Sequence, residues 1–359
     1  MERVAAAIVR DNLGRAAIRA ALETFHLAAR AGIGRGVRPR GLIFTLHHVR
    51  PAIDRAFAPN AHLEVTPEFL DAALGTLIDE GFEPVRLDDL PGLVGSEAAA
   101  RRCFAVTLDD GYRNNRDYAL PVFRRHRVPH TVFVARGFAE RCRSAWWETA
   151  ARLIGDLDEI RSDFGTGAET LPCATPAEKA AAFRRLARVI RSPHEDERIA
   201  ALDEEARRHG IEPLDTIRDE VMDAAELKDF AADPLVTLGA HTLTHPSLAH
   251  VTPERLAEEL VGSADYVETI TGSRPRALAY PYGDCHSAGR REYDAARTAG
   301  FDLAVTTNPG VLDQATIRSQ PFALPRISLN GHYQKARYVR ALASGLPFRM
   351  LGRRSRIEA

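Results

Sequence analysis

The chain has 359 residues, 45% of them hydrophobic, which is enough for one large domain or two ordinary ones with a sizeable core. Basic and acidic residues nearly cancel, at 48 against 49, so the overall charge gives no attraction to nucleic acid. The cysteines form no Cys-x-x-Cys pair, which argues against a zinc knuckle or a redox motif and favours reduced thiols. They stand at Cys103, Cys142, Cys173 and Cys285.

No secretory signal and no membrane-spanning segment is predicted. The first ten residues lack an apolar run of the right length, and the charged residues Arg10, Asp11 and Arg15 interrupt the adjoining stretch. No later segment is apolar for long enough to cross a bilayer. We therefore expect a cytoplasmic protein.

Residues 1–40 are expected to form an N-terminal amphipathic helix and a linker. Apolar side chains recur at helical spacing from about Val4 to Ala31, separated by arginines, and a stretch rich in arginine and glycine comes next. Such a helix can pack on the domain. It can also lie on an anionic membrane, here the inner face, because arginines outnumber acids in it. The basic tail, residues 346–359, repeats this bias.

Between residues 41 and 345, short apolar runs alternate with segments of helical pattern. The runs lie at 42–46, 104–108, 131–135, 235–240, 278–280 and 303–306. Strands that alternate with helices predict parallel βα units, closed as a barrel or open as a sheet. In both architectures the functional site lies at the carboxyl ends of the strands.

The alternation stops between about residues 148 and 227. Segments Glu178–Ile190 and Glu195–Arg208 are charged and have helical periodicity. We predict an inserted helical subdomain that covers the site or mediates contacts.

Two adjacent carboxylates, Asp109 and Asp110, directly follow one of the apolar runs, and Gly111 lets the chain turn at once. Adjacent residues of a strand point to opposite faces, but at a turn both side chains can approach one cavity. One carboxylate can then bind a metal while the other handles protons. The alternative is a solvated turn, since Asp and Gly are common turn residues.

Another apolar run leads into His241 and His245. Two histidines with three residues between them can face the same way on one helical turn and ligate one metal. His126 and His130 have the same spacing, but Pro129 argues against a shared helical face, so we expect that pair to lie at the surface or to be structural. Two histidines and one carboxylate leave coordination positions open for water and substrate, as a catalytic zinc requires.

Three motifs in this order carry a resemblance to a known family. They are Thr-Leu-Asp-Asp-Gly at 107–111, His-Thr-Leu-Thr-His-Pro at 241–246 and Ala-Tyr-Pro-Tyr-Gly at 279–283. They resemble the first three motifs of the NodB-type polysaccharide deacetylases, carbohydrate esterase family four, over most of the chain from Leu42 to about Leu329. The resemblance implies a distorted (β/α) barrel and a hydrolase that removes N- or O-linked acetyl groups from a saccharide or polysaccharide.

The resemblance also implies a role for each matching residue. Asp110, His241 and His245 would bind a divalent metal, usually zinc, and Asp109 would be the general base that takes a proton from the water it holds. A bound metal acidifies water and polarises the acetyl carbonyl, so attack becomes feasible near neutral pH. The backbone N–H of Tyr282 would help to hold the developing oxyanion.

The general acid departs from the common pattern. Many family members carry it in a Leu-x-His motif near the carboxyl end, and this chain has none. Some relatives carry a histidine on the first strand instead, and the sequence around His47 and His48 resembles that context. We predict His47 as the acid, with His48 as the second choice, because histidine titrates close to neutrality. The alternative is that both histidines merely cap the first strand.

A family arginine is also missing. It often stands two residues before the proline of the third motif, where this chain has Ala279. We predict that Arg326 replaces it and holds Asp109 ionised through a charged hydrogen bond.

The tryptophan pair has two possible roles. Trp146 and Trp147 can offer faces for a sugar ring, although adjacent tryptophans more often anchor a subdomain to a core.

The main alternative function is a catalytically degenerate relative that binds glycan without hydrolysing it. A metal-dependent glycosyltransferase ranks last, because it has no need for His241 and His245 together. The sugar, the acetyl linkage, a polymeric or lipid-linked substrate and the oligomeric state are not predicted.

Overall fold

The computed structural model describes residues 2–33, 39–95, 101–165 and 167–351, with side chains from residue 13 onward in the first helix. The expected linker at 34–38, most of the basic tail and the Val4 side chain lie outside the described residues. No helix within these ranges is both long enough and apolar enough to cross a bilayer.

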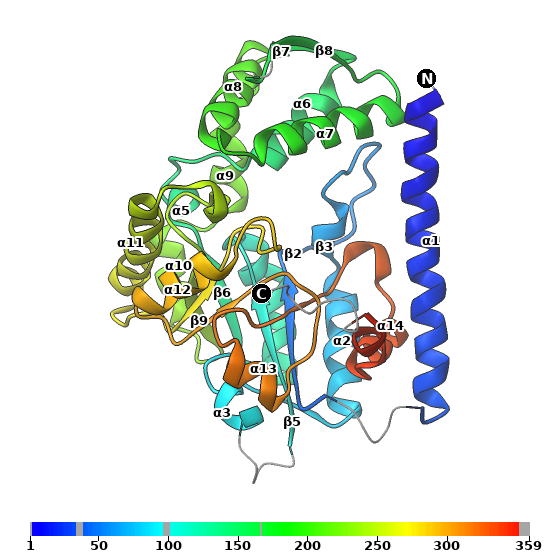
Figure 1. Cartoon of the computed structure of the whole chain (residues 1–359), viewed down its shortest axis with the longest axis vertical. Helices are drawn as coiled ribbons and strands as arrows, with labels where there is room; N and C mark the ends of the chain where they lie inside the picture. The colour runs from blue at the N-terminus through cyan, green and yellow to red at the C-terminus, as the bar shows by residue number, and fades with distance from the viewer. Residues whose placement is uncertain (1, 34–38, 96–100, 166, 352–359) are drawn as a thin grey trace.

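A curved sheet of parallel strands forms the body of the molecule (Figure 1). The strands follow the order β11-β10-β9-β6-β5-β1-β12, and β4 pairs with β5 off this path. Their bounds are β1 (Gly41–Leu46), β4 (Phe82–Pro84), β5 (Arg102–Leu108), β6 (His130–Val134), β9 (Val236–Ala240), β10 (Ala277–Ala279), β11 (Leu303–Val305) and β12 (Ile327–Ser328). All pairs in this sheet are parallel, so the predicted α/β class is confirmed.

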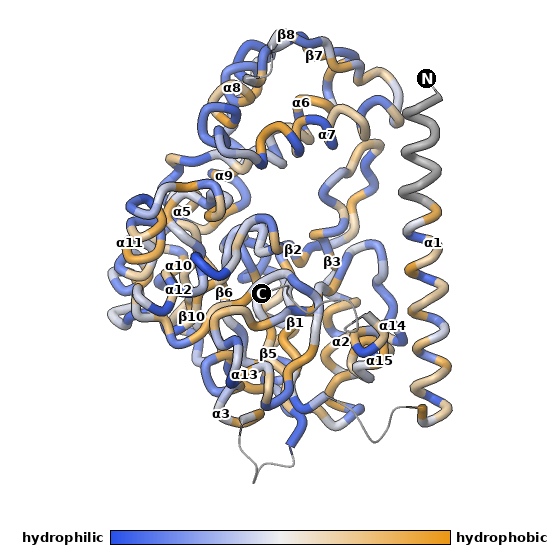
Figure 2. The backbone as a smooth tube through the Cα atoms, in the orientation of Figure 1, coloured by the Kyte–Doolittle hydropathy of each residue, from blue (hydrophilic) through white to orange (hydrophobic). Residues whose placement is uncertain are grey.

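One short segment links the two edges of this sheet. Leu324 forms a parallel bridge with Val305 of β11, and three residues later Ile327 pairs with Phe44 of β1. The sheet therefore curls into a distorted barrel, and all carboxyl strand ends face the same side. Side chains on both faces of β1 and most of those of β5 are buried, which explains why the strands read as continuous apolar runs. Figure 2 shows this apolar character along β5.

Helices cover the outside of the barrel. They are α2 (Pro67–Asp79), α3 (Leu90–Gly95), α4 (Leu120–His126), α11 (Pro253–Thr271), α12 (Arg290–Thr298), α13 (Gln314–Ser319), α14 (Ala336–Ala343) and α15 (Leu346–Leu351). The first of these begins where the Thr66 side chain accepts a hydrogen bond from the Phe69 N–H. It buries Leu70, Leu74 and Leu77 against the sheet.

The first helix, α1 (Glu2–Arg30), runs along the outside of the barrel and extends to the insertion (Figure 1). Leu22 packs against Tyr338 of α14, and Glu23 accepts hydrogen bonds from Arg337 and Tyr338. The described part of the helix is thus fixed to the barrel through one face.

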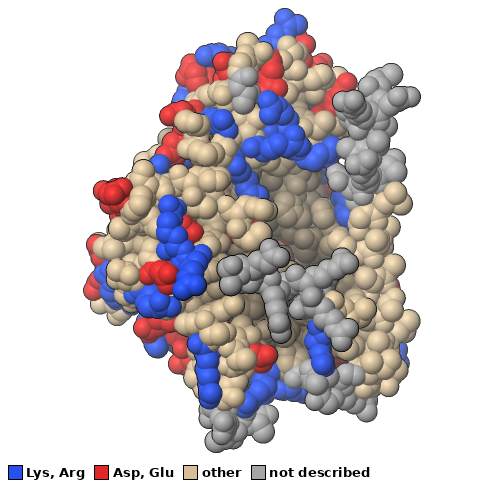
Figure 3. All heavy atoms as spheres, viewed as in Figure 1, with Lys and Arg blue, Asp and Glu red and all other residues tan. Residues whose placement is uncertain are grey.

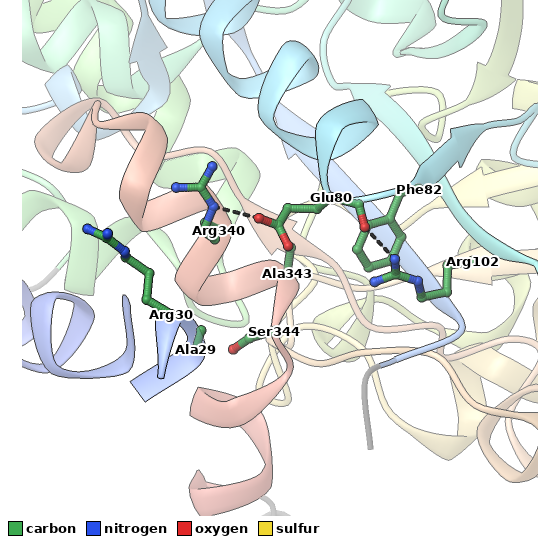
Figure 4. Close-up of a pocket in the computed structure, with 8 residues that line it drawn as sticks. All are labelled: Ala29, Arg30, Glu80, Phe82, Arg102, Arg340, Ala343 and Ser344. Atoms are coloured by element: carbon green, nitrogen blue, oxygen red, sulfur yellow. Dashed lines mark hydrogen bonds and ion pairs between the residues drawn. The ribbon is translucent and has the colours of Figure 1, made fainter. Parts of the chain in front are cut away.

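A cavity of about 350 Å³ lies where α1, α2 and α14 end (Figure 4). Its lining residues are Ala29, Arg30, Glu80, Phe82, Arg102, Arg340, Ala343 and Ser344. Arg340 donates to the Glu80 carboxylate at 2.6 Å, and Arg102 donates to the Glu80 carbonyl. Three helix carboxyl ends meet here, and each carries a partial negative charge that cations stabilise. The arginines are therefore explained by these helix ends. The cavity adjoins the amino end of β5, away from Asp109.

The chain between β6 and β9 forms the insertion. It contains α5 (Arg136–Ala139), α6 (Trp146–Asp156), β7 (Glu159–Asp163), β8 (Ala168–Pro172), α7 (Pro176–Ile190), α8 (Glu195–Arg208), α9 (Pro213–Glu220) and α10 (Ala224–Ala231). Strands β7 and β8 pair as an antiparallel hairpin, which adds two strands to the predicted helical insertion. The hairpin was not predicted because Ile160 is the one fully buried residue of β7, and the period-two signal is correspondingly weak.

The insertion has a hydrophobic core of its own, which continues into the barrel. Leu153, Leu186 and Leu202 form part of it, together with Tyr112 from the loop that follows β5 and Phe138 of α5, directly after β6. The insertion is therefore packed onto the same side of the barrel to which the strand ends point.

Candidate metal centre

Three predicted ligands meet at one point above the sheet. One ligand atom from each of Asp110, His241 and His245 lies within 4.8 Å of the other two. The Asp110 Oδ1 atom is 3.6 Å from Nε2 of His241 and 3.5 Å from Nε2 of His245. All three residues are buried. Segments that are more than 100 residues apart in the chain thus converge, because both follow parallel strands of one sheet.

The two histidines do not share a helical turn, contrary to the geometry expected from their spacing. They lie in a loop in which Thr242 and His245 have φ angles of 66° and 57°. Asp110 and Tyr282, at 73° and 59°, are also left-handed. Left-handed conformations cost about 1 kcal/mol or more for residues other than glycine, so the surrounding structure must hold these loops in place.

A buried carboxylate on α11 supports the histidine loop. Glu259 accepts hydrogen bonds from the backbone N–H groups of Leu243 and Thr244, at 2.7 and 2.9 Å, and from the Thr244 hydroxyl. Nothing in the local sequence distinguishes Glu259, because a glutamate on a helix is normally a solvated side chain. Thr242 adds a contact of its own, since its hydroxyl accepts the His245 N–H at 3.0 Å.

The orientation of His241 suits a metal ligand. Its Nδ1 lies 2.7 Å from the Ala279 carbonyl, so Nδ1 carries the proton and the Nε2 lone pair faces Asp110. Burial lowers the pKa of His241 and of His245, which keeps both imidazoles neutral. Burial and the neighbouring Asp109 raise the pKa of Asp110, and its Oδ1 has no hydrogen-bond donor among the described residues. A divalent cation would supply the positive charge that this buried oxygen lacks, so the three residues fit one.

Asp109 has a different partner. Arg326 donates from Nη1 and Nη2 to the two carboxylate oxygens, both at 2.7 Å. The guanidinium is fully buried and also donates to the Thr306 carbonyl and the Thr107 hydroxyl. Burial alone would raise the pKa of Asp109, but Arg326 outweighs it and holds the pKa well below the usual range. Asp109 is therefore ionised.

The structure separates the two candidate acids. The Nε2 atom of His47 lies 3.9 Å from Oδ2 of Asp109, and its side chain is 22% exposed. Burial lowers its pKa to about 4. His48 is fully buried, its ring lies 3.6 Å from that of Tyr112, and its Nδ1 is 2.9 Å from the Asn114 amide. Of the two histidines, only His47 therefore contacts the ionised carboxylate.

Tyr282 is held by the insertion. Its hydroxyl donates to Glu195 at 2.5 Å and accepts from the Trp146 indole at 2.8 Å, and the Arg191 guanidinium lies 4.6 Å from the ring centroid. Within the described ranges, no protein group accepts the Tyr282 backbone N–H. The ring of His245 is 5.3 Å from that of Tyr282. The insertion thus holds the Tyr282 ring next to His245.

The tryptophan pair is buried rather than open. Trp146 and Trp147 are 5% and 8% exposed, and the Trp147 ring packs 5.2 Å from His245 and 5.9 Å from Phe138. Neither indole offers a free face to a sugar ring, so both anchor the insertion. A hollow between the insertion and the barrel is visible in Figure 3, with basic side chains along its upper edge.

The remaining histidine pair lies elsewhere. His126 is 2.9 Å from Asp71, and His130 stacks on Phe123 with 4.1 Å between ring centroids.

Comparison with known proteins decides the family. The polysaccharide deacetylase family profile matches residues 96–163 and 182–304, which is more than half of the chain. The chain belongs to the polysaccharide deacetylase family. The matched ranges include Asp109, Asp110, His241, His245 and Tyr282, and they skip part of the insertion. No curated protein matches this family member at a significant level.

Solved structures share its fold at low sequence identity. The Streptococcus pyogenes deacetylase PplD, solved with acetate, is 16% identical with a TM-score of 0.52, covering 82% of this chain and 94% of its own. IcaB from Ammonifex degensii is 17% identical with a TM-score of 0.52, covering 85% and 97%. A Bacillus cereus polysaccharide deacetylase is 16% identical with a TM-score of 0.52, covering 85% and 69%. These likenesses confirm the distorted barrel.

We expect one divalent cation to bind per chain. Changes to groups that merely support a metal's ligands cost roughly 10–100-fold in affinity, so direct ligand changes such as His245→Ala and Asp110→Asn should cost about 100-fold or more. Chelator competition with Zn²⁺ measures this. His126→Ala is the matched control, because its pair has the same spacing but lies away from the centre. Equal affinity in all of these variants would contradict the assignment.

Proposed function

We propose that this family member is a metal-dependent hydrolase that removes acetyl groups from a saccharide. One observation carries the proposal: the buried Asp110–His241–His245 cluster stands beside a carboxylate, Asp109, that is held ionised. A ligand set alone would suit many metal proteins. The adjacent base gives it a use in hydrolysis, and family membership favours an acetyl group on a sugar.

The cluster residues would hold the cation, and zinc is our choice because two of the three ligands are imidazoles. When bound, the cation would acidify a water molecule and polarise the acetyl carbonyl. Asp109 then accepts a proton at its carboxylate as general base. Arg326 keeps that carboxylate ionised and fixes its orientation through two parallel hydrogen bonds.

The leaving amine or alcohol needs a proton, and His47 is our candidate donor. It is the histidine that reaches Asp109 while remaining partly exposed toward substrate. Proton transfer from the protonated carboxyl group of Asp109 would then restore the proton that His47 has given to the leaving group, within a single turnover. The Tyr282 N–H is our candidate donor to the oxyanion, because the geometry leaves it without an acceptor among the described residues.

The alternative function, a degenerate relative that only binds glycan, leaves the buried Arg326–Asp109 pair without a role. A binding protein gains nothing from an arginine that is buried to pair with one aspartate. Buried pairs of this kind are not a reliable source of stability, so their presence favours a catalytic use. The substrates that release acetate will show whether the acetyl group is N-linked or O-linked. They will also show whether the saccharide is polymeric or short.

We expect acetate release from N- or O-acetylated oligosaccharides, lost on chelation and restored by Zn²⁺. Asp109→Asn and His47→Gln should each lower kcat by about 100-fold or more, as general acid–base groups contribute roughly 10²–10⁴-fold. Both variants should retain bound metal. Asp117→Asn, an exposed aspartate on the same stretch of chain, serves as the control. Acetate release that is insensitive to chelation would contradict the proposal.

Loss of the arginine should move the pH profile. In Arg326→Gln the main group that opposes burial is lost, so the pKa of Asp109 rises and the base is protonated at pH values where the native base is ionised. The acidic limb of kcat/KM therefore shifts to higher pH, measured at saturating Zn²⁺. In the native protein the depressed pKa of Asp109 stabilises the fold at pH values above the unfolded-state pKa, and this contribution disappears as the pH falls. The Arg326→Gln variant lacks this contribution at every pH.

Arg326→Lys is the matched control for that experiment. It keeps the charge but not the planar fork, so kcat should fall while the acidic limb stays near its native position. A limb that does not move in Arg326→Gln would show that another group sets it.

For the domain organisation we propose an N-terminal unit (1–40), the deacetylase barrel with its insertion (41–345) and a basic tail (346–359). We further propose that α1 contacts a membrane peripherally. Its outward side within the described range has no acidic residue and presents Leu13, Ala17, Ala20, Thr24 and Leu27, three or four positions apart. Leu13 and Leu27 are both 63% exposed. Arg19 and Arg30 are also exposed on this helix, Arg30 at its carboxyl end where it lines the cavity described above, and their charge suits anionic headgroups.

Co-sedimentation with vesicles tests this contact. We expect the protein to bind vesicles that contain anionic phospholipid more strongly than zwitterionic ones, because the arginines add attraction to the apolar contact. Leu13→Gln with Leu27→Gln should weaken binding several-fold. Val261→Gln, at an exposed position on α11, is the control. Equal binding by all three proteins would end the idea.

A further inference from the structure

The two histidine ligands are oriented in different ways. The Nδ1 atom of His241 donates to the Ala279 carbonyl, which fixes its ring. In the described ranges, no carbonyl or carboxylate of another residue accepts from Nδ1 of His245. Its ring packs instead against aromatic side chains, with its centroid 5.2 Å from that of Trp147 and 5.3 Å from that of Tyr282. The position of His245 therefore depends on its loop and on these neighbouring rings.

One buried carboxylate of the insertion contacts both the loop and one of these rings. Glu195 is the first residue of α8 and is 5% exposed. Its Oε2 atom accepts the backbone N–H of Ser247 at 2.8 Å, two residues after His245. Its Oε1 atom accepts the Tyr282 hydroxyl at 2.5 Å. Each carboxylate oxygen thus holds a different neighbour of the same ligand.

The histidine loop is thereby held on both sides of His245. Glu259 of α11 accepts two backbone N–H groups before this histidine, and Glu195 accepts that of Ser247 after it. A buried N–H group is costly without an acceptor, and a carboxylate is a strong acceptor. The loop needs such anchors, because the φ angle of His245 is 57°. The anchor after the histidine comes from the insertion and not from the barrel.

The start of α8 is itself attached to the barrel. Asp196, the residue after Glu195, pairs with Arg143 at 2.6 Å and with Arg255 of α11. Arg255 also donates to the Thr244 hydroxyl at 3.2 Å, so one arginine joins the start of α8 to the histidine loop. Glu195 therefore projects from a helix end that is connected to this loop at more than one point.

We propose that Glu195 is a positioning residue of the metal centre, which fixes His245 through its loop and through the Tyr282 ring. The inference rests on the proposed metal-dependent function for the presence of the cation. Two separate donors require two acceptor oxygens, which a carboxylate supplies. The insertion would then raise the affinity for the cation, although all three metal ligands follow strands β5 and β9 of the barrel.

Metal affinity tests this role without relying on turnover. Glu195→Ala should bind Zn²⁺ about 10–100-fold more weakly than the native protein in chelator competition, the range expected when a group that orients a ligand is removed. Glu205→Ala is the matched control. Glu205 lies on the same helix, is 3% exposed and bonds to Arg208 and His209 rather than to either loop. Its replacement should lower the thermal stability but leave the Zn²⁺ affinity within about 2-fold of the native value.

Two further variants separate the two contacts of Glu195. Tyr282→Phe removes the hydroxyl and keeps the Ser247 contact, and Glu195→Gln keeps one acceptor oxygen that the Ser247 N–H can use. Each should therefore bind Zn²⁺ more tightly than Glu195→Ala and more weakly than the native protein. Both variants keep the test decisive in the case that Glu195→Ala does not fold.

Native affinity in Glu195→Ala, or an equal loss of affinity in Glu205→Ala, would overturn the proposal. Native affinity in both Tyr282→Phe and Glu195→Gln would overturn it where Glu195→Ala does not fold, and so would a native protein that binds no Zn²⁺. A native protein that binds Zn²⁺ but releases no acetate would end the proposed function alone, because weaker Zn²⁺ binding by Glu195→Ala would still support the role of Glu195.

Discussion

The pairing of Arg326 with Asp109 is the contact on which the rest of the site depends. Arg326 lies on the segment that links β11 to β1, so the residues that close the barrel also supply the charge that keeps the base ionised. Removing one partner of a buried pair typically costs about 3–5 kcal/mol, because the other charge is left without compensation. Barrel closure and the state of Asp109 are therefore coupled: a chain in which this segment has not docked has neither a complete sheet nor an ionised carboxylate in the interior.

Beside that pair stand loops whose conformations are unfavourable in isolation. Asp110, Thr242, His245 and Tyr282 are all left-handed, and the histidine loop and Tyr282 are stabilised by contacts from outside their own loops. Glu259 holds the histidine loop from α11, and the insertion holds Tyr282 through Trp146 and Glu195. Local strain is thus balanced by tertiary contacts, which is expected where ligand atoms must be fixed before a cation binds.

Periodicity and composition predicted the main strands and helices closely, because continuous apolar runs and helical spacing reflect burial. The convergence of Asp110 with the two histidines was also predictable, since parallel strands place their carboxyl ends on one side. Glu259 and the direction of His48 were not, because each depends on a partner far along the chain that no local pattern encodes. The two-residue β12 was missed for the same reason: its identity as a strand comes from pairing with β1, not from its own sequence. Arg326 could be predicted only because Ala279 stands where the family often has an arginine.

The division of labour between barrel and insertion follows from where each polar group is anchored. Asp109, Asp110 and the two histidines are fixed by the sheet and by α11, and the hydrogen bonds that orient Asp109 and His241 come from Arg326 and Ala279 of the barrel. The insertion reaches the centre through Val221, which bridges Tyr112, and through Glu195, which accepts from the Tyr282 hydroxyl. Trp147 of α6 also packs on His245. Changes at Val221 or Glu195 are therefore expected to move the two tyrosines that border the metal cluster, because these residues set their positions.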